Sequence, residues 1–250
     1  GGVHLIQMLN MLELFPLGKL GHNGADGLHL MIETMKLVYA DRAQHLGDPD
    51  FWDVPIKGLT SKAYAKSLAA GIDPRRARPS VQISHGDPAP YESNETTHFS
   101  VMDGAGNVVS NTYTLNFSFG TGIVAPGTGI LLNNEMDDFS AKPGVPNAFG
   151  LVGGEANAIQ GGKRPLSSMT PTIVFKDGQP LLATGSPGGS RIITMVLQIL
   201  LNVIDHDLNI AEATAAPRIH HQWLPDKLWV ERGLGPDTLA ILRQRSHQAT

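Results

Sequence analysis

The sequence predicts an α+β fold in which layers of helix and sheet stack on one another. Apolar residues recur at helical spacing up to about residue 95 and at every second position after it, which is typical of strands. Turn signals rich in Gly, Asn and Asp divide the second part into hairpins, and a strongly apolar helix follows them. Helices first, then hairpins with a covering helix, favour stacked layers around one core.

The first part is expected to be helical. The expected helices are Val3 to Leu14, Ala25 to Leu46 and Lys62 to Ala70. Pro16 and Gly18 end the first helix, Gly47 ends the second, and Ser61 is a typical N-cap for the third. The segment from Gly71 to Pro90 contains several prolines, so we expect a surface linker there.

The second part is expected to contain hairpins and three helices. The hairpins join His98 to Met102 with Val108 to Thr114, and Thr172 to Phe175 with Leu181 to Thr184; Gly129 to Leu132 and Leu228 to Glu231 are further short strands. Ser190 is expected to cap an apolar helix from Arg191 to about Ile204. Asn209 with Glu212 caps the next helix, and Pro236 begins the last.

Composition excludes several classes of protein. With a net charge of −4, the chain shows no nucleic-acid-binding face. The absence of cysteine excludes disulfides and thiolate metal sites. The longest apolar run, Ile192 to Ile204, is interrupted by polar residues and is too short to span a membrane. His220 and His221 are adjacent, and neighbouring residues in a strand face opposite sides, so we expect no metal site from them.

Both ends of the sequence resemble cut ends. The chain opens with "GGVHLIQMLNMLELF", without an initiator Met, and enters directly into a helical pattern. It closes with "LRQRSHQAT", which is expected to stop within a helix. We therefore expect the middle part of a longer protein, and the missing targeting signal carries no information about location.

A pair of threonines marks the boundary between the two parts. In "YESNETTHFSV", Thr96 and Thr97 stand where a polar loop meets a strand. A hydroxyl needs a base to become a nucleophile, and a threonine at a chain N-terminus has its own α-amine for this purpose. Cleavage of the Glu95–Thr96 bond would create that N-terminus. The alternative is that both threonines are ordinary β-branched strand residues.

Three further motifs carry candidate chemistry. In "SPGGSRI", the amides of Gly188 and Gly189 precede a helix and favour an oxyanion or a carboxylate, unless the motif is only a tight turn. In "NNEMDDFSAKPGVPNAFGLVGG", an acidic cluster precedes a long Gly- and Pro-rich segment that fits a lid. In "KRPLSSMTPT", Ser167 and Ser168 are suited either to bind a carboxylate or to cap a turn.

Taken together, these motifs resemble one family over essentially all 250 residues. The motifs are "YESNETTHFSV", "TYTLNFSFGTGI", "GILLNNEMDDFSAKPG", "KRPLSSMTPTIV", "GSPGGSRI" and "EATAAPRIHHQWLP". Their order and spacing are similar to those of the γ-glutamyltranspeptidases, or glutathione hydrolases, of the bacterial branch. The resemblance implies part of an N-terminal nucleophile hydrolase fold, an αββα sandwich. It also implies a self-cleaving precursor, with residues 1–95 from the large subunit and 96–250 from a small subunit truncated at its C-terminus.

The resemblance also assigns roles to individual residues. It implies Thr96 as nucleophile, Thr114 as the residue that positions it, and the amides of Gly188 and Gly189 as the oxyanion site. The residues implied to bind the glutamyl group are Asn116, Glu135 and Asp138 for its α-ammonium and Ser167 and Ser168 for its α-carboxylate. Phe149 stands near the tip of the lid, where several bacterial members carry Tyr. No cofactor and no metal are implied.

The implied substrates are small γ-glutamyl donors such as glutathione, with water, amino acids or peptides as acceptors. The resemblance further implies a periplasmic or secreted protein. The chain departs from the family in one respect, because the substrate-binding arginine of the upstream large subunit lies outside it. Two alternatives stay open: a non-catalytic remnant or glutamate-binding module, and a cephalosporin or glutaryl acylase of the same superfamily.

Overall fold

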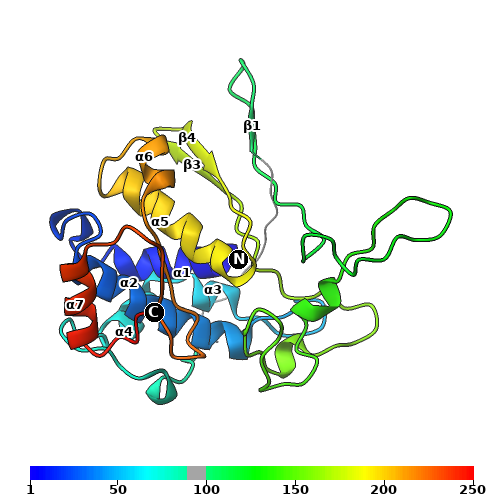
Figure 1. Ribbon diagram of the computed structural model, residues 1–250, viewed down its shortest axis with the longest axis horizontal. Coiled ribbons are helices and arrows are strands. Elements are labelled where there is room, and N and C mark those ends of the chain that lie inside the picture. Colours follow the sequence, from blue (N-terminus) through cyan, green and yellow to red (C-terminus); the bar gives the residue numbers. More distant parts are fainter. Residues whose placement is uncertain (89–99) are drawn as a thin grey trace.

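The chain folds into a body of helices from which two segments project (Figure 1). The computed structural model describes residues 1–88 and 100–250. The α-helices are α1 (Gly2–Leu12), α2 (Ala25–His45), α3 (Ile56–Leu59), α4 (Lys62–Ala69), α5 (Ile192–Ile204), α6 (Ile210–Ala215) and α7 (Pro236–Gln244). The strands are β1 (Val101–Met102), β2 (Val108–Val109), β3 (Thr172–Lys176), β4 (Gln179–Thr184), β5 (Ile219–His220) and β6 (Trp229–Val230). The predicted order of helices, hairpins and a covering helix is confirmed.

Helix α2 lies at the centre of the helical body. Every residue from Gly27 to Arg42 is buried, so the helix has no solvent-facing side over that range. It packs against α1 and α7, and α1 in turn packs against α4 and α5. Apolar residues of these helices form one core, to which Met8, Met35 and Ile193 belong. Since burial of an unpaired charge is costly, the charged residues of α2 need partners inside the protein.

Two of the three predicted N-caps form the expected hydrogen bonds at the starts of their helices. Ser61 accepts a hydrogen bond from the amide of Tyr64 at 3.1 Å, which confirms the cap of α4. Asn209 accepts from the first amides of α6 and confirms that cap as well. The predicted Ser190 cap is wrong: α5 has no side-chain cap, and the Ser190 hydroxyl donates to Oε1 of Gln222 at 2.9 Å instead. The chain does not stop within a helix either, because α7 ends at Gln244.

The described strands pair into three two-stranded antiparallel sheets, β1 with β2, β3 with β4, and β5 with β6. Both predicted hairpins are present, although the first is shorter than expected and the positions of His98 and Phe99 lie outside the described residues. Asp177 and Gly178 form the turn of the second hairpin, with φ values of 52° and 77° that suit a tight two-residue turn. The strand predicted for Gly129 to Leu132 is wrong: only a single bridge joins Val124 to Leu131.

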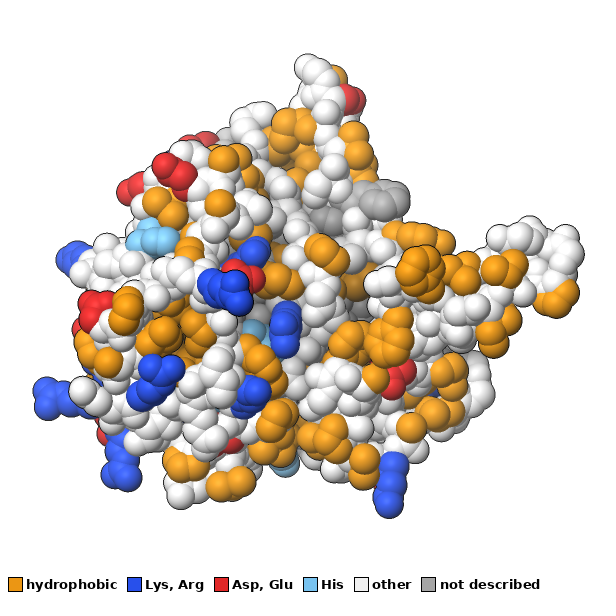
Figure 2. Space-filling model, in the orientation of Figure 1, with side chains coloured by type: hydrophobic (Ala, Val, Ile, Leu, Met, Phe, Trp, Pro, Cys, Tyr) orange, Lys and Arg blue, Asp and Glu red, His pale blue; other side chains and the backbone are white. Residues whose placement is uncertain are grey.

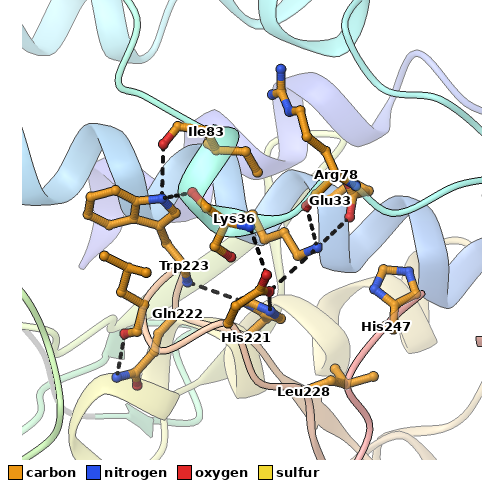
Figure 3. A network of polar contacts seen from close by, with 12 residues as sticks. Glu33, Lys36, Arg78, Ile83, His221, Gln222, Trp223, Leu228 and His247 are labelled. Atoms are coloured by element: carbon orange, nitrogen blue, oxygen red, sulfur yellow. Dashed lines mark hydrogen bonds and ion pairs between the residues drawn. The ribbon is translucent and has the colours of Figure 1, made fainter. Parts of the chain in front are cut away.

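The segment predicted as a surface linker is partly buried. Its residues Ala77, Ser80 and Ile83 lie in the interior, and Ser80 is fully shielded from solvent. The indole Nε1 of Trp223 donates to the carbonyl oxygens of Ser80 and Ile83 at 3.0 and 3.1 Å (Figure 3). The prediction failed because proline content reports the absence of regular structure and not exposure. The segment instead packs between the helical part and the C-terminal part of the chain, with hydrogen bonds to both.

The two projections carry apolar side chains on their surfaces. Figure 2 shows hydrophobic side chains along the β1–β2 hairpin and along the loop that follows β2. Among them, Val101, Phe119 and Ile130 are 62%, 73% and 62% exposed. Exposed apolar surface of this kind is typical of regions that pack against another polypeptide. In the part of the chain that the structure describes, no helix is both long and apolar enough to cross a membrane.

Candidate active site

Most of the predicted site residues surround one cavity of about 470 Å³. The predicted residues that line it are Thr114, Asn116, Asp138, Ser167, Ser168, Gly188 and Gly189. They come from the loops after β2 and before β3 and from the turn between β4 and α5, which are far apart in the sequence. Ser100, the first described residue after the threonine pair, also lines the cavity. Glu95 and Thr96 themselves lie outside the described residues.

The Gly188–Gly189 turn has a backbone that other residues rarely adopt. The φ values are 133° for Gly188 and 56° for Gly189, both in the region that favours glycine. A Cβ atom on Gly189 would lie 2.5 Å from the ring of Phe149, so a side chain does not fit there. Neither amide donates to another group of the described residues. Two free amides at the start of the α5 region are suited to stabilise negative charge.

Ser167 and Ser168 form the side of the cavity that faces the helical body. Ser168 is buried, and its hydroxyl oxygen accepts a hydrogen bond from Nη2 of Arg42 at 2.9 Å. The hydroxyl oxygen of Ser167 accepts from the amide of Met169 at 3.1 Å. A hydroxyl that accepts one hydrogen bond retains its proton for donation. Both serines can therefore donate to an anionic group in the cavity.

The acidic cluster forms a 3₁₀ helix, Glu135–Asp138, beside the cavity. Burial raises the pKa of Asp138 to about 6, the charge of Arg42 opposes this shift, and Asp137 adds to it. Burial and the charge of Asp138 also raise the pKa of Glu135, which does not line the cavity. Above pH 6 the Asp138 carboxylate carries a negative charge that suits an ammonium group.

Thr114 and Asn116 form a tight pair at the cavity wall. Asn116 has a left-handed backbone with a φ of 72°, and its amide donates to Oγ1 of Thr114 at 2.8 Å. Its side-chain Nδ2 donates to the carbonyl oxygen of Asn134 at 3.1 Å. The side-chain oxygen of Asn116 and the hydroxyl proton of Thr114 are not used in these contacts, so each can serve a group in the cavity.

Phe149 lies beside the cavity and not in its wall. Its ring packs edge to face on Phe117, with ring centroids 5.5 Å apart, and contacts the Gly189 backbone position described above. Together with the Gly188–Gly189 turn it borders an adjacent depression. The predicted lid segment is locally ordered, because the amide of Asn147 donates to the carbonyl of Leu151 at 3.0 Å. Phe149 thus covers the glycine turn from the outside.

Arg42 is the site residue that sequence reasoning missed. It stands in the last turn of α2, within a pattern that reads as an ordinary helix. The signal in the sequence is weak: an arginine follows directly on "LVYAD", in a segment otherwise rich in apolar residues. Only the fold shows that this arginine reaches Ser168, which lies 126 positions further along the chain.

The described residues contain no group of three or more His, Asp or Glu side chains that could hold a metal ion. The adjacent histidines have separate partners. His220 contacts the hydroxyl of Thr194 and donates from Nε2 to the side-chain Oε1 of Gln222, whereas His221 contacts Asp226. The cavity offers hydrogen-bond donors, the Asp138 carboxylate and the amides of Gly188 and Gly189, which have no partner among the described residues. These groups are suited to bind a zwitterionic ligand and to stabilise an oxyanion.

The chain is similar to known proteins over its full length. Residues 1–250 match the gamma-glutamyltranspeptidase family. The chain is 62% identical to the glutathione hydrolase proenzyme of Escherichia coli K12 over 99% of this chain and 43% of that protein. It therefore spans less than half the length of this curated relative.

Solved structures support the predicted fold class. A crystal structure of acivicin-inhibited gamma-glutamyltranspeptidase matches with a TM-score of 0.60 and 58% identity, over 62% of this chain and 83% of that chain. The cephalosporin acylase of Bacillus halodurans matches with a TM-score of 0.82 and 27% identity, over 100% of this chain and 42% of that chain. These neighbours confirm the predicted fold class, of which this chain contains a part. With a family match over its full length, the chain belongs to the gamma-glutamyltranspeptidase family.

Proposed function

We propose that the chain is part of a self-processing γ-glutamyltransferase and glutathione hydrolase. The observation that carries this proposal is the convergence of the predicted ligand-binding and oxyanion residues around one cavity. The described chain resumes at the wall of that cavity with Ser100, close in sequence to Thr96. In this proposal residues 1–95 belong to the large subunit and residues 96–250 to the small subunit.

The first reaction is self-cleavage of the precursor. The Thr96 hydroxyl attacks the carbonyl carbon of Glu95, and the peptide bond is replaced by an ester. Water then hydrolyses the ester and leaves Thr96 with a free α-amine. That amine is the base that the threonine lacked in the precursor.

The second reaction uses the same hydroxyl on a γ-glutamyl donor such as glutathione. Its α-amine takes the hydroxyl proton, the hydroxyl oxygen attacks the γ-carbonyl, and the leaving amine takes up a proton. The amides of Gly188 and Gly189 stabilise the oxyanion, and one such donor contributes about 3 kcal/mol. Thr114 holds the nucleophile. Water or an amino acid or peptide then accepts the γ-glutamyl group.

The cavity binds the glutamyl group through both of its charges. Asp138 and Asn116, which line the cavity, are proposed to hold the α-ammonium, and Ser167 and Ser168 the α-carboxylate. Glu135 lies outside the lining and is proposed to add negative charge from the same 3₁₀ helix as Asp138. Phe149 covers the oxyanion site as part of the lid. By resemblance to bacterial members of the family, we also propose a periplasmic or secreted location, which fractionation of the source cells would test.

Self-cleavage is the first test. We expect the intact mass of the purified full-length protein to show two chains, the smaller beginning at Thr96. A Thr96→Ala variant is expected to remain one uncut chain without activity. An uncut wild-type protein would contradict the proposal, because Thr96 would then be an ordinary strand residue.

Substrate choice separates this proposal from the acylase alternative, to which the similarity with a cephalosporin acylase points. The matched pair of substrates is a γ-glutamyl anilide and a glutaryl anilide, which differ only in the α-amino group. The Asp138 carboxylate favours the γ-glutamyl compound, and we expect it to be hydrolysed much faster. Equal or faster hydrolysis of the glutaryl compound would favour an acylase, and binding of glutamate without turnover of either compound would favour a binding module.

A further inference from the structure

Arg42 is a buried cation with few partners among the described residues. Arg42 is only 5% exposed. Among the described residues it makes one hydrogen bond, to the hydroxyl of Ser168. Its Nε is buried and without a partner, and no carboxylate of the described residues lies within ion-pair distance. Burying a guanidinium in this way costs desolvation free energy, which lowers the stability of the folded chain.

The position of Arg42 relates it to the candidate active site. It does not line the main cavity but borders a second one of about 200 Å³. Asp138 borders both cavities and therefore separates Arg42 from the space that a ligand would occupy. Arg42 thus stands directly behind two residues of the main cavity, Ser168 by a hydrogen bond and Asp138 by charge.

We infer that Arg42 is a positioning residue that prepares Ser168 and Asp138 for the two charges of an α-amino-acid ligand. This inference rests on the proposed function. By donating to the Ser168 oxygen, Arg42 occupies one lone pair and leaves the hydroxyl proton to be donated to an α-carboxylate. By its positive charge, it favours the ionised carboxylate of Asp138, which an α-ammonium requires.

The charges around Asp138 define the expected pH dependence. Arg42 lowers the pKa of Asp138, whereas burial and Asp137 raise it, and Glu135 is the other carboxylate coupled to it. Loss of the Arg42 charge leaves only the influences that raise this pKa. The pH below which the ligand is lost should therefore move upward.

The test compares full-length Arg42→Met, Arg42→Lys and Ser168→Ala proteins on a γ-glutamyl anilide. For Arg42→Met we expect a rise in KM of about tenfold to a hundredfold, the effect of losing a hydrogen bond to a charged group, with a much smaller change in kcat. We also expect the acid limb of kcat/KM to move to higher pH. Arg42→Lys retains the charge, so its acid limb should stay near that of the wild type while KM remains raised.

Coupling and controls distinguish a positioning role from a structural one. In an Ser168→Ala background, Arg42→Met should add little to KM, because the hydrogen bond is already absent. Arg75→Met, which changes an exposed arginine, should leave kcat, KM and the acid limb unchanged. Intact mass and thermal unfolding establish that each variant is cleaved and folded. If Arg42→Met does not fold, Arg42→Lys and Ser168→Ala with their double variant carry the test.

Different outcomes contradict different proposals. A wild-type protein that is cleaved but does not hydrolyse the anilide contradicts the proposed function. A wild-type protein that hydrolyses it, with Arg42 variants of unchanged KM and unchanged acid limb, contradicts only the role of Arg42. Fully additive effects of Arg42→Met and Ser168→Ala would also contradict it.

Discussion

Helix α2 carries two buried cations, Lys36 and Arg42, that differ in how completely they are paired. Lys36 is 2% exposed, and its Nζ lies 2.8 Å from Oε1 of Glu33 and 2.9 Å from the carbonyl oxygen of Arg78. Asp226 is at 3.9 Å. Among the described residues, Arg42 has one hydrogen-bond partner, the Ser168 hydroxyl. A buried cation that is fully paired within the protein contributes to the stability of the fold. A buried cation with unused donors beside a cavity is suited to orient the groups that line the cavity.

The surroundings of Lys36 form a closed network (Figure 3). Its second carboxylate, Asp226, accepts from the amide of Ser80 at 2.8 Å and contacts Nε2 of His221 at 3.2 Å. The amide of Arg78 donates to Oε2 of Glu33 at 3.1 Å. The network joins α2 to the segment before the proposed cleavage site and to the loop before β6. Its role is therefore to hold together parts of the chain that belong to both proposed subunits.

The largest effect on stability is expected at Lys36. A Lys36→Met substitution leaves Glu33 buried without its cation, and breaking a buried pair typically costs about 3–5 kcal/mol. Chemical denaturation of the full-length protein measures this loss. A Lys36→Met/Glu33→Gln double variant should recover part of it. A loss below about 1 kcal/mol for the single variant would mean that the network does not stabilise the fold.

The second largest effect on stability is expected when the pH is lowered. It involves the His29–His247 pair, which lies beside this network. Nε2 of His29 donates to the carbonyl oxygen of Asp73 at 2.8 Å, so in the neutral ring Nδ1 accepts from Nε2 of His247 at 2.7 Å. Burial first, then the charges of Lys36, His29 and His221, lowers the pKa of His247 to about 2, against an opposing influence of Asp226. The unfolded chain takes up this proton near pH 6.5 and the folded chain does not, so stability falls as pH drops below 6.5.

At pH 5 this difference amounts to about 2 kcal/mol for one histidine. A His247→Gln variant retains a donor for His29 but no titrating ring, and its unfolding free energy should change less between pH 7 and pH 5 than that of the wild type. Equal changes in both proteins would show that the pair does not contribute to acid sensitivity.

The smallest effect on stability is expected at Arg42. An Arg42→Met substitution removes one hydrogen bond but also removes the cost of burying the charge, and replacing a poorly paired buried ion by an apolar residue is often neutral. We expect a change within about 1 kcal/mol in the same denaturation experiment, in contrast to Lys36→Met. A loss of stability as large as that of Lys36→Met would mean that both cations stabilise the fold to the same extent, which contradicts the difference drawn between them.

Local patterns in the sequence predicted most of the fold. Helical spacing predicted α1, α2 and α4, and alternation with turn residues predicted the β3–β4 hairpin, because these signals arise within a few neighbouring residues. The errors concern contacts between distant residues. The Ser190 hydroxyl fits an N-cap, but Gln222 provides a buried partner that the local sequence does not reveal.

The candidate site could be predicted in part. Motifs predicted Asp138, Ser168 and the Gly188–Gly189 turn, since each motif is contiguous and similar to one family. Arg42 could not be predicted, because its partner lies on another segment and nothing in its own surroundings distinguishes it from other helical arginines. The position of Thr96, outside the described residues, remains a prediction.

The continuity of α2 has a consequence for how this chain can vary. Lys36 and Arg42 are six residues apart, which separates them by about 9 Å along the helix and turns them by about 240° around it. One inserted or deleted residue between them would rotate one cation by about 100° relative to the other, so it could not face its partners. A substitution changes one side chain at a time, whereas the number of residues in this stretch of α2 sets the angle between the Lys36 network and the candidate active site. We therefore expect related chains to keep that number fixed.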